Sequence, residues 1–564
     1  MTRAVTDDAC SSDPDNLTGM TERHIIEYKA RTSYPFCLPE ETIVKVYNRS
    51  TGQEQQLKRI KKEYSSQGWV VQEDLYDAED LFIGSKKIRY NKFGKVIYEE
   101  DMTGAIIERV YDENNNMIEE LNPLGLRKLL TYDFCNRLIT IQEGDLVKHF
   151  RYNLKNERIE ETDYSGNVTH YFFDELGRDI GKELPSFFSE EGLTTLKTTI
   201  EYDLLDNPTL EKDSLGNITK TLFTIHKKPY LIQHPDGTVE KFIYDLDGVL
   251  TESVDKYGNT TKIISDYQGR PVSIEVLSPS GDSLKKTTRQ YNAFHLISET
   301  DALGCVTHHE YDDAGRLIKK RRGTSLEEYV YDSLSRPWKT INWTSDQDAI
   351  VTFKQFDHKD RIVEQRIESL SGLVQDQVIY EYNAMDQITK ETHFQAVTQF
   401  IYNLHGDLIE TINPLGVSIK LEYDYHVIDA KGEKGMRITS IDPKGVLLII
   451  DKNALGEEKR GEKKNSLGET LELWDVLFNA RGEKSKRIDV AYHMGKQLRH
   501  VITSWKWDCY GRLESLTEGY SSPDEKKTSI IYNSFGQRAS IIKPSGIQNF
   551  FSYDTLGRQS RWYS

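Results

Sequence analysis

A short motif recurs along most of the chain and restricts the folds open to it. The motif is an aromatic residue, Asp or Asn, two variable positions, a turn-forming residue and often Arg, as in the stretch YDDAGR at 311–316. Of seventeen copies, sixteen begin with an aromatic residue and fifteen carry Gly, Asn or Asp at the fifth position. These three residue types tolerate positive φ, so the fifth position is predicted to lie in a tight turn. The copies begin at Tyr90, Tyr111, Tyr132, Tyr152, Phe173, Tyr202, Tyr244, Ser265, Tyr291, Tyr311, Tyr331, Phe356, Tyr382, Tyr402, Trp507, Tyr532 and Tyr553.

The spacing of the copies indicates regular hairpins. The first five copies, from Tyr90 to Phe173, follow one another at intervals of 20 or 21 residues. A second turn signal lies between them, with Asn or Asp first and Gly fourth, as in the stretch NPLG at 122–125. That pattern is typical of a type I turn. The chain is therefore expected to turn about every ten residues, which leaves strands of about six or seven residues.

Between the turns the side chains alternate in character, as in residues 106–111, and no helical spacing is sustained. The predicted fold class is all-β: a long antiparallel meander of about 21-residue repeats, two strands per repeat. We expect the leading aromatic residues to form a ladder on neighbouring strands. The Asp or Asn that follows each of them is expected to bind the backbone of its own turn.

The residues of the motif are therefore assigned a structural role rather than a catalytic one. The predicted structural signature comprises Tyr90, Tyr111, Asp112, Tyr132, Asp133, Phe173, Asp174, Gly177, Arg178, Tyr311, Asp312, Gly315, Arg316, Trp507, Asp508, Gly511, Arg512, Tyr553, Asp554, Gly557 and Arg558.

The repeats also suggest how the chain is organised. Residues 1–20 are expected to be disordered, 21–85 to form degenerate strands, and 86–428 to hold the regular repeats. Residues 429–490 are irregular and densely charged, and within them 429–487 are expected to protrude or be mobile. Residues 491–564 carry the terminal repeats. Pro185 to Leu193 is interpreted as a lengthened hairpin loop.

Composition excludes several functional classes. The formal net charge is −17, and the short basic run 319–322 is interpreted as a solvated strand end, so we expect no nucleic-acid partner. The longest apolar run, Val446 to Ile450, is far below the roughly 20 residues of a membrane span. Five cysteines without a CxxC pair give no disulfide framework or zinc finger. The first twenty residues lack the apolar region of a secretory signal.

No catalytic or ligand-binding motif stands out. There is no HExxH, GxSxG, Walker A or dinucleotide fingerprint. His308 and His309 are adjacent on a strand and are expected to point to opposite faces, which disfavours a shared metal. Asp112 to Asn116 is interpreted as a repeat turn rather than a calcium loop. We therefore expect no catalytic residue, no metal and no cofactor.

The aromatic-Asp-x-x-Gly-Arg motif at about 21 residues resembles the YD repeat of the RHS family, over about residues 40–564. That family includes bacterial Rhs polymorphic toxins, the C component of insecticidal toxin complexes and the teneurin YD shell. The resemblance implies that the meander spirals into a hollow, here partial and open, β-shell. It further implies that bacterial members enclose a C-terminal toxin segment until delivery.

The sequence also departs from that family. Bacterial members usually follow the repeats with a plug that contains Asp-Pro motifs and often cleaves itself, whereas the last repeat, at Tyr553, lacks the Pro. Asp442-Pro443 fits the intervening turn and is assigned no catalysis. We therefore expect a truncated chain, or one half of a two-chain shell, without plug or toxin.

Three functions are weighed. The favoured one is a non-enzymatic RHS-type shell that encloses or delivers a toxin. The alternative is a surface adhesion or carbohydrate-binding protein, with Trp338 and Trp343, or Trp505 and Trp507, as sugar contacts. The third, a β-propeller built from pairs of repeats, is disfavoured because longer intervals break the blade period.

The expected partners are a toxin passenger, a second shell chain or cap, or a cell-surface carbohydrate. The expected location is outside the cell or at its surface by a non-classical route, or the cytoplasm for an unexported fragment. Without a partner on its open edges, the chain is expected to be poorly soluble.

Overall fold

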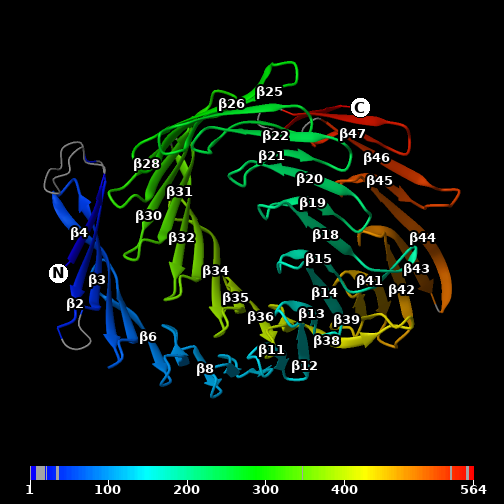
Figure 1. Cartoon of the computed structure of the whole chain (residues 1–564), viewed down its shortest axis with the longest axis horizontal. Helices are drawn as coiled ribbons and strands as arrows, with labels where there is room; N and C mark the ends of the chain where they lie inside the picture. Colours follow the sequence, from blue (N-terminus) through cyan, green and yellow to red (C-terminus); the bar gives the residue numbers. More distant parts are fainter. Residues whose placement is uncertain are drawn as a thin grey trace. The chain divides into compact units, whose positions relative to one another are not determined.

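The computed structural model describes residues 2–7, 20, 22–32, 37–345, 347–493, 495–533, 536–553 and 558–563. These residues form 49 strands and no helix, so no helix is available that would be long and apolar enough to cross a membrane. Strands that follow one another in the chain pair antiparallel, and Figure 1 shows such runs side by side in green and teal. The predicted all-β antiparallel meander is confirmed.

The chain divides into two units, and each unit contains two segments that are distant in sequence. Unit 1 consists of an early row, Met1–Leu130, and a late row, Arg289–Gly416. Unit 2 consists of an early row, Thr131–Thr288, and a late row, Val417–Ser564.

The strands of unit 1 are bounded as follows. The early row contains β1 Thr2–Asp7, β2 Arg23–Ala30, β3 Pro39–Asn48, β4 Gln53–Tyr64, β5 Val70–Tyr76, β6 Phe82–Tyr90, β7 Val96–Glu100, β8 Ile106–Tyr111, β9 Met117–Leu121 and most of β10 Arg127–Tyr132. The late row contains the end of β26 Ser283–Tyr291, then β27 Leu296–Thr300, β28 Val306–Tyr311, β29 Leu317–Arg322, β30 Ser325–Tyr331, β31 Pro337–Ser345, β32 Asp348–Phe356, β33 Ile362–Ser369, β34 Val374–Tyr382, β35 Ile388–His393, β36 Ala396–Tyr402 and β37 Leu408–Ile412.

The strands of unit 2 are bounded as follows. The early row contains β11 Leu138–Glu143, β12 Leu146–Tyr152, β13 Arg158–Thr162, β14 Val168–Phe173, β15 Asp179–Glu183, β16 Phe187–Ser189, β17 Gly192–Thr194, β18 Lys197–Tyr202, β19 Pro208–Lys212, β20 Ile218–Phe223, β21 Pro229–Gln233, β22 Val239–Tyr244, β23 Leu250–Val254, β24 Thr260–Ser265 and β25 Pro271–Leu277. The late row contains β38 Ser418–Ile428, β39 Lys434–Ile441, β40 Leu447–Lys452, β41 Glu458–Lys464, β42 Thr470–Phe478, β43 Lys484–His493, β44 Lys496–Trp507, β45 Leu513–Glu518, β46 Lys526–Tyr532, β47 Arg538–Ile542, β48 Gln548–Tyr553 and β49 Gln559–Tyr563.

The same turn closes most hairpins. After β28, the Gly315 N–H donates to the carbonyl of Asp312 at 3.0 Å, and the Asp312 N–H donates to the carbonyl of Arg316 at 2.9 Å. Gly315 has a φ of 72°, and the strand register shifts between Glu310 and Tyr311, just before the turn. This is a type I turn followed by a left-handed residue and a bulge. Asn and Asp take the left-handed position elsewhere, as at Asn115 and Asp206, both with φ 64°.

Successive turns alternate between the two ends of the strands. Turns that begin with the Asp or Asn of the repeated motif close one end, and we call them signature turns. The turns between them, such as 101–104 and 122–125, close the other end and are called intervening turns.

Little of the molecule forms a closed core. Most strand residues are half-buried or exposed on both faces of the sheet. The main apolar cluster lies in unit 2, where Phe187, Trp474, Val476 and Phe478 are buried against one another. Phe187 and Phe478 are 0% and 1% exposed, and their rings meet edge to face.

Three segments differ from expectation. Within residues 1–20, Thr2–Asp7 forms strand β1 and pairs with β2, while 8–19 lie outside the described residues. Residues 429–487 do not protrude as an irregular segment: they form regular strands from β39 to β43. Pro185 to Leu193, interpreted as a long loop, contains β16 and the start of β17, a short hairpin that leaves β15 paired with β18.

Candidate functional site: clasps and seams of the repeat turns

Each signature aspartate organises its own turn. One carboxylate oxygen of Asp312 accepts the N–H groups of Ala314 and Arg316, both at 2.9 Å, and the other accepts Arg316 Nε at 2.7 Å. Asp133, Asp174 and Asp508 bind their turns in the same way. The Arg137 side chain lowers the pKa of Asp133, as expected for a carboxylate bonded to a guanidinium.

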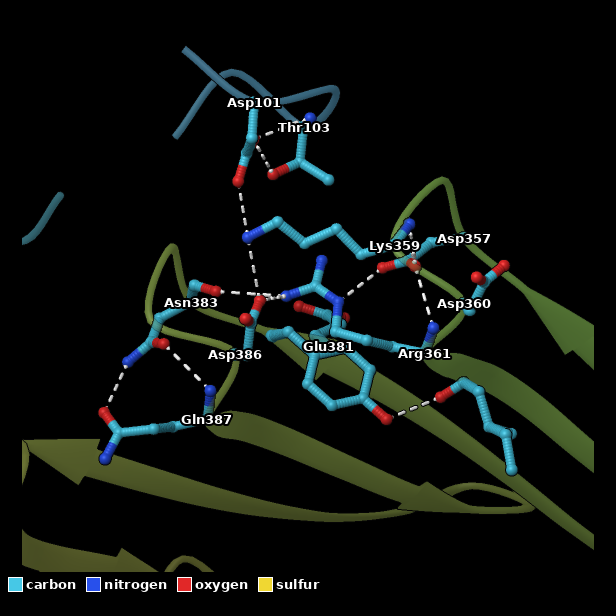
Figure 2. Close-up of polar contacts among 12 residues, drawn as sticks. Asp101, Thr103, Asp357, Lys359, Asp360, Arg361, Glu381, Asn383, Asp386 and Gln387 are labelled. Atoms are coloured by element: carbon cyan, nitrogen blue, oxygen red, sulfur yellow. Dashed lines mark hydrogen bonds and ion pairs between the residues drawn. The ribbon is translucent and has the colours of Figure 1, made fainter. Parts of the chain in front are cut away.

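The arginine of the motif also reaches the next repeat (Figure 2). Arg361 donates through Nε to Asp357 at 2.6 Å and through a terminal nitrogen to Asp386 at 2.6 Å. Its guanidinium lies 4.6 Å from the centre of the Tyr382 ring. A guanidinium fits this position because it can bind a carboxylate and stack on a ring at once.

The aromatic residue completes the link in the reverse direction. The Tyr382 hydroxyl donates to the carbonyl of Ile362, the residue after Arg361, at 2.6 Å. We call this combination of Asp, Arg and the next aromatic residue a clasp. Equivalent arginine-over-aromatic contacts join Arg137 to Tyr152, Arg178 to Tyr202, Arg316 to Tyr331, Arg336 to Phe356 and Arg512 to Tyr532.

The clasp replaces the expected aromatic ladder. The leading aromatic residues end alternate strands, not neighbouring ones, because each repeat contributes two strands. Since neighbouring strands lie about 4.8 Å apart, alternate strands are too distant for direct ring stacking. In six repeats a guanidinium contacts the ring instead, and in two others the ring is contacted by Lys228 or by the imidazole of His295.

The predicted signature residues occupy equivalent places in their repeats. The aromatic residues Tyr90, Tyr111, Tyr132, Phe173, Tyr311, Trp507 and Tyr553 each end a strand. Tyr311 and Tyr553 donate to the carbonyls of Leu296 and Arg538, and Trp507 Nε1 donates to that of Lys484. Gly177, Gly315 and Gly511 all have positive φ. Asp112 is followed by Asn116 in place of the arginine and accepts its side-chain amide. Asp554 and Gly557 lie outside the described residues, and Arg558 is exposed.

In unit 1, signature turns of the late row contact intervening turns of the early row. Arg49 donates through Nε to Asp313 at 2.6 Å, and the Ala78 N–H donates to the carbonyl of Ser333 at 3.0 Å. Figure 2 shows Lys359 extending from its signature turn to Asp101, at 2.5 Å. We call this line of contacts the seam of unit 1.

Lys359 joins the seam to a clasp. Its ammonium also contacts Asp386 at 3.0 Å, the carboxylate that Arg361 binds. Partial burial acts to lower the pKa of Lys359, but the hydrogen bonds to Asp101 and Asp386 outweigh it and raise that pKa. The ammonium therefore stays charged where two rows meet.

Unit 2 has a seam of the same construction. Lys434 donates to the carbonyl of Gly166 at 2.9 Å, and Ser214 donates to that of Ala480 at 3.2 Å. The Tyr510 hydroxyl donates to Asp236, and Arg512 donates to the Tyr257 hydroxyl at 2.8 Å.

Two pKa values reflect the bond between Asp236 and Tyr510. Partial burial acts to raise the pKa of Asp236, but hydrogen bonds from Thr238 and Tyr510 lower it to about 2. Burial and the bond to Asp236 raise the pKa of Tyr510 to about 12.

Sequence reasoning missed both seams. Contacting residues lie 255 to 296 positions apart, as Ala78 and Ser333 or Glu190 and Lys486 show. Residues such as Arg49 and Lys434 follow no shared pattern, so no periodic signal marks them.

Of the two tryptophan pairs predicted as sugar contacts, Trp338 and Trp343 do not form a common platform. Trp338 and Trp343 stand an odd number of positions apart on β31 and so point to opposite faces. Trp507 uses its indole N–H on a backbone carbonyl. A cavity of about 610 Å³ lies beside Phe188 and strands β38 to β43, but its charges pair with one another, as Arg437 does with Asp451 at 2.6 Å. Among the described residues, no group of three or more His, Cys, Asp or Glu side chains is placed to hold a metal ion.

Comparison with solved structures identifies the fold. The chain matches TcdB2-TccC3-TEV with a TM-score of 0.59 at 11% identity, over all of this chain and 35% of the solved one. It matches TcdB2-TccC3 with a TM-score of 0.52 at 12% identity, over 93% of this chain and 36% of the other. A Tc holotoxin pore of Photorhabdus luminescens with a mutated TccC3 gives 0.51 at 12% identity, over 93% and 35%.

Sequence comparison gives a weaker relationship. No family model matches the chain. Double-stranded DNA deaminase toxin A of Burkholderia cenocepacia (strain H111) is 24% identical over 311 residues, which cover 49% of this chain and 19% of that protein. The chain thus spans about a third or less of the proteins it matches. Its fold is that of the RHS/YD-repeat shell in the Tc toxin structures, and the resemblance in the repeats is confirmed at the level of the fold.

Proposed function

We propose that this chain is a non-enzymatic segment of an RHS-type shell wall that encloses a toxin segment and keeps it inactive until delivery. The observation that carries the proposal is the seam: in each unit, two rows of a sheet one layer thick meet turn to turn. A wall one sheet thick has no hydrophobic core to hold its parts together. Clasps link successive repeats within a row, and seams link two rows, so that the sheet can extend without such a core.

The exposure and charge of both faces of the sheet support the proposal that it forms a wall. Its two faces are half-exposed and rich in charge, as in the cross-strand pairs of Arg109 with Glu99 and Glu120. Few side chains are fully buried, so the stability depends on hydrogen bonding between neighbours. Such a sheet can separate two aqueous spaces.

The named relatives support a toxin as the enclosed cargo. The solved neighbours are parts of Tc toxin complexes, and the sequence relative is a toxin. By this proposal the cargo is a separate segment or chain, and the shell functions outside the producing cell after export by a non-classical route.

A protected-passenger experiment tests the proposal. The full chain is fused at its C-terminus to a small ribonuclease, and the activity is measured on long RNA and on a dinucleotide. Because a segment of the wall shields the passenger on one side only, we expect cleavage of long RNA to fall more than cleavage of the dinucleotide, and protease to digest the fused passenger more slowly than the free ribonuclease. Equal activity on both substrates and rapid digestion of the passenger beside an intact shell chain would overturn the proposal.

A further inference from the structure

One row of signature turns carries a line of exposed apolar side chains. In the early row of unit 2, seven consecutive turns at one end of the strands, from 133–136 to 266–269, each present one; six are signature turns, and the remaining one, 224–227, begins with Thr224 in place of Asp or Asn. We call these seven residues the apolar rim. They are Phe134 at 95% exposure, Leu154 at 103%, Leu176 at 76%, Leu204 at 102%, Ile225 at 83%, Leu246 at 103% and Tyr267 at 88%. Single exposed leucines are ordinary, but an uninterrupted series marks an interaction surface.

The signature turns of the late rows make their seam contacts through polar groups, although Leu404 at 52% and Met385 at 43% are also exposed there. In the late row of unit 1 the variable positions hold Asp313, Ser333 and Lys359, which make polar contacts with the early row. In the late row of unit 2 the equivalent contacts come from Ala480 and Tyr510. Apolar side chains thus occupy the variable positions in the early row of unit 2, whose signature turns lie at the end of the strands away from the seam.

A complementary surface lies on the opposite type of turn. Four intervening turns in the late row of unit 1 expose Leu303 at 50%, Leu370 at 46%, Phe394 at 55% and Leu415 at 86%. Both seams follow one rule: intervening turns of an early row meet signature turns of a late row. Under that rule, the turns left over are the signature turns of the early rows and the intervening turns of the late rows.

We propose that the apolar rim of one copy of this chain docks on the intervening turns in the late row of unit 1 of a second copy. The same two types of turn that meet within each unit then meet between copies, and apolar side chains replace the ion pairs. Because the two surfaces differ, the contact is head-to-tail and can extend beyond a dimer. This goes beyond the proposed function, since it needs no enclosed passenger.

Sedimentation velocity of the full chain over a concentration series tests the docking. We expect concentration-dependent association for the natural sequence. The triple variant Leu154→Asp, Leu204→Asp and Leu246→Asp is expected to weaken association by more than about 100-fold, since each tenfold loss needs only about 1.4 kcal/mol. All three residues occupy variable positions of a type I turn, which accept Asp, and their full exposure predicts unchanged folding by circular dichroism.

A matched variant separates apolar character from shape. Leu154→Met, Leu204→Met and Leu246→Met retain a large apolar side chain, so association is expected to persist. If the Asp triple variant associates as strongly as the natural chain, the rim is not the contact.

Complementation tests the head-to-tail geometry. The variant Leu303→Asp, Leu370→Asp and Leu415→Asp lacks the second surface but retains the rim. Each triple variant alone is expected to be monomeric, and an equimolar mixture is expected to give a 1:1 dimer that does not extend. A natural chain that stays monomeric at all concentrations, or a mixture that stays monomeric, would overturn the proposal.

Discussion

The guanidinium of Arg361 stacks on the ring of Tyr382, although the two residues belong to successive repeats. The same side chain binds Asp357 in its own turn and Asp386 in the next. One residue thus couples two turns, and the sheet is held together by a series of such nearest-neighbour links. This arrangement is the basis of the first prediction.

Replacing Arg361 with Lys is expected to lower the stability of unit 1 by about 1–3 kcal/mol, because Lys keeps the charge but loses the forked contacts and the stacking. Denaturant unfolding, followed by intrinsic fluorescence, measures the change. Arg127→Lys is the control: Arg127 is 63% exposed and forms a surface ion pair with Glu119, so less than about 0.5 kcal/mol is expected. Equal effects of the two substitutions would contradict the clasp.

Glycine substitutions separate backbone strain from the seam. Gly304 has φ +77° and open space where the methyl group of an alanine would lie, whereas a Cβ at Gly315 would meet Glu22 Oε1 at 2.6 Å. Gly304→Ala is expected to cost about 1–2 kcal/mol through strain alone. Gly315→Ala is expected to cost more and to increase amide exchange in β2, because it displaces Glu22 from His295. Asn tolerates positive φ, so Gly304→Asn is expected to be nearly as stable as the natural chain. Gly315→Asn is expected to remain destabilised, because its side chain would still meet Glu22.

The seam of unit 2 is expected to weaken at both extremes of pH. The pKa of Asp236 is lowered to about 2 in the folded chain. Its contribution to the free energy of unfolding is therefore complete above the pKa of the unfolded chain, near 3.9, and is lost as the pH falls toward 2. The pKa of Tyr510 is raised to about 12 in the folded chain. Its contribution to the free energy of unfolding is therefore complete below the pKa of the unfolded chain, about 10, and is lost as the pH rises through 12. The melting temperature of Tyr510→Phe should therefore depend less on pH than that of the natural chain in both ranges.

Tyr329 provides the control for this pH dependence. Burial and its bond to Glu327 raise its pKa to about 12, but both residues lie within one row. Tyr329→Phe is expected to alter the stability of unit 1 in the alkaline range and to leave the seam of unit 2 unchanged. If Tyr510→Phe leaves the acid range unchanged, Asp236 and Tyr510 are not coupled.

Removal of a buried ring is expected to release the hairpin of β16 and β17. Phe478 is 1% exposed and packs on Phe187, so Phe478→Ala is expected to cost about 3–5 kcal/mol. Limited proteolysis should then cut within residues 185–195. Phe134→Ala removes a ring that is 95% exposed, and less than about 0.5 kcal/mol is expected. Protection of the hairpin in Phe478→Ala would contradict this role of the cluster.

The turns were predictable because their chemistry is local. An Asp or Asn that binds its own turn and a residue that tolerates positive φ are visible in any single repeat. The interpretation of 429–487 as a protruding, irregular segment was wrong because the motif is degenerate there while the turn chemistry is kept. The turn at Asp429 keeps only the first residue and a Gly three positions later, and that is enough to close a hairpin.

The seams were not predictable because their geometry depends on the curvature of many strands. Asp101 and Lys359 are ordinary surface residues in the sequence, and only the folded rows bring them together. The aromatic ladder failed for a related reason: the sequence shows both the rings and the arginines of the motif, but not that an arginine such as Arg361 stacks on the ring of the next repeat.

The hairpin of β16 and β17 shows how a protein of this kind can gain residues during evolution. A hairpin added within a row would shift every later turn against its partner some 255 to 296 positions away and break the seam. The inserted hairpin instead branches out of the row, so that β15 still pairs with β18. The insertion lengthens the sequence between two partner turns but leaves their positions in the fold unchanged. Gene variants with side branches are therefore expected to survive selection, whereas those that lengthen one row alone are expected to be lost.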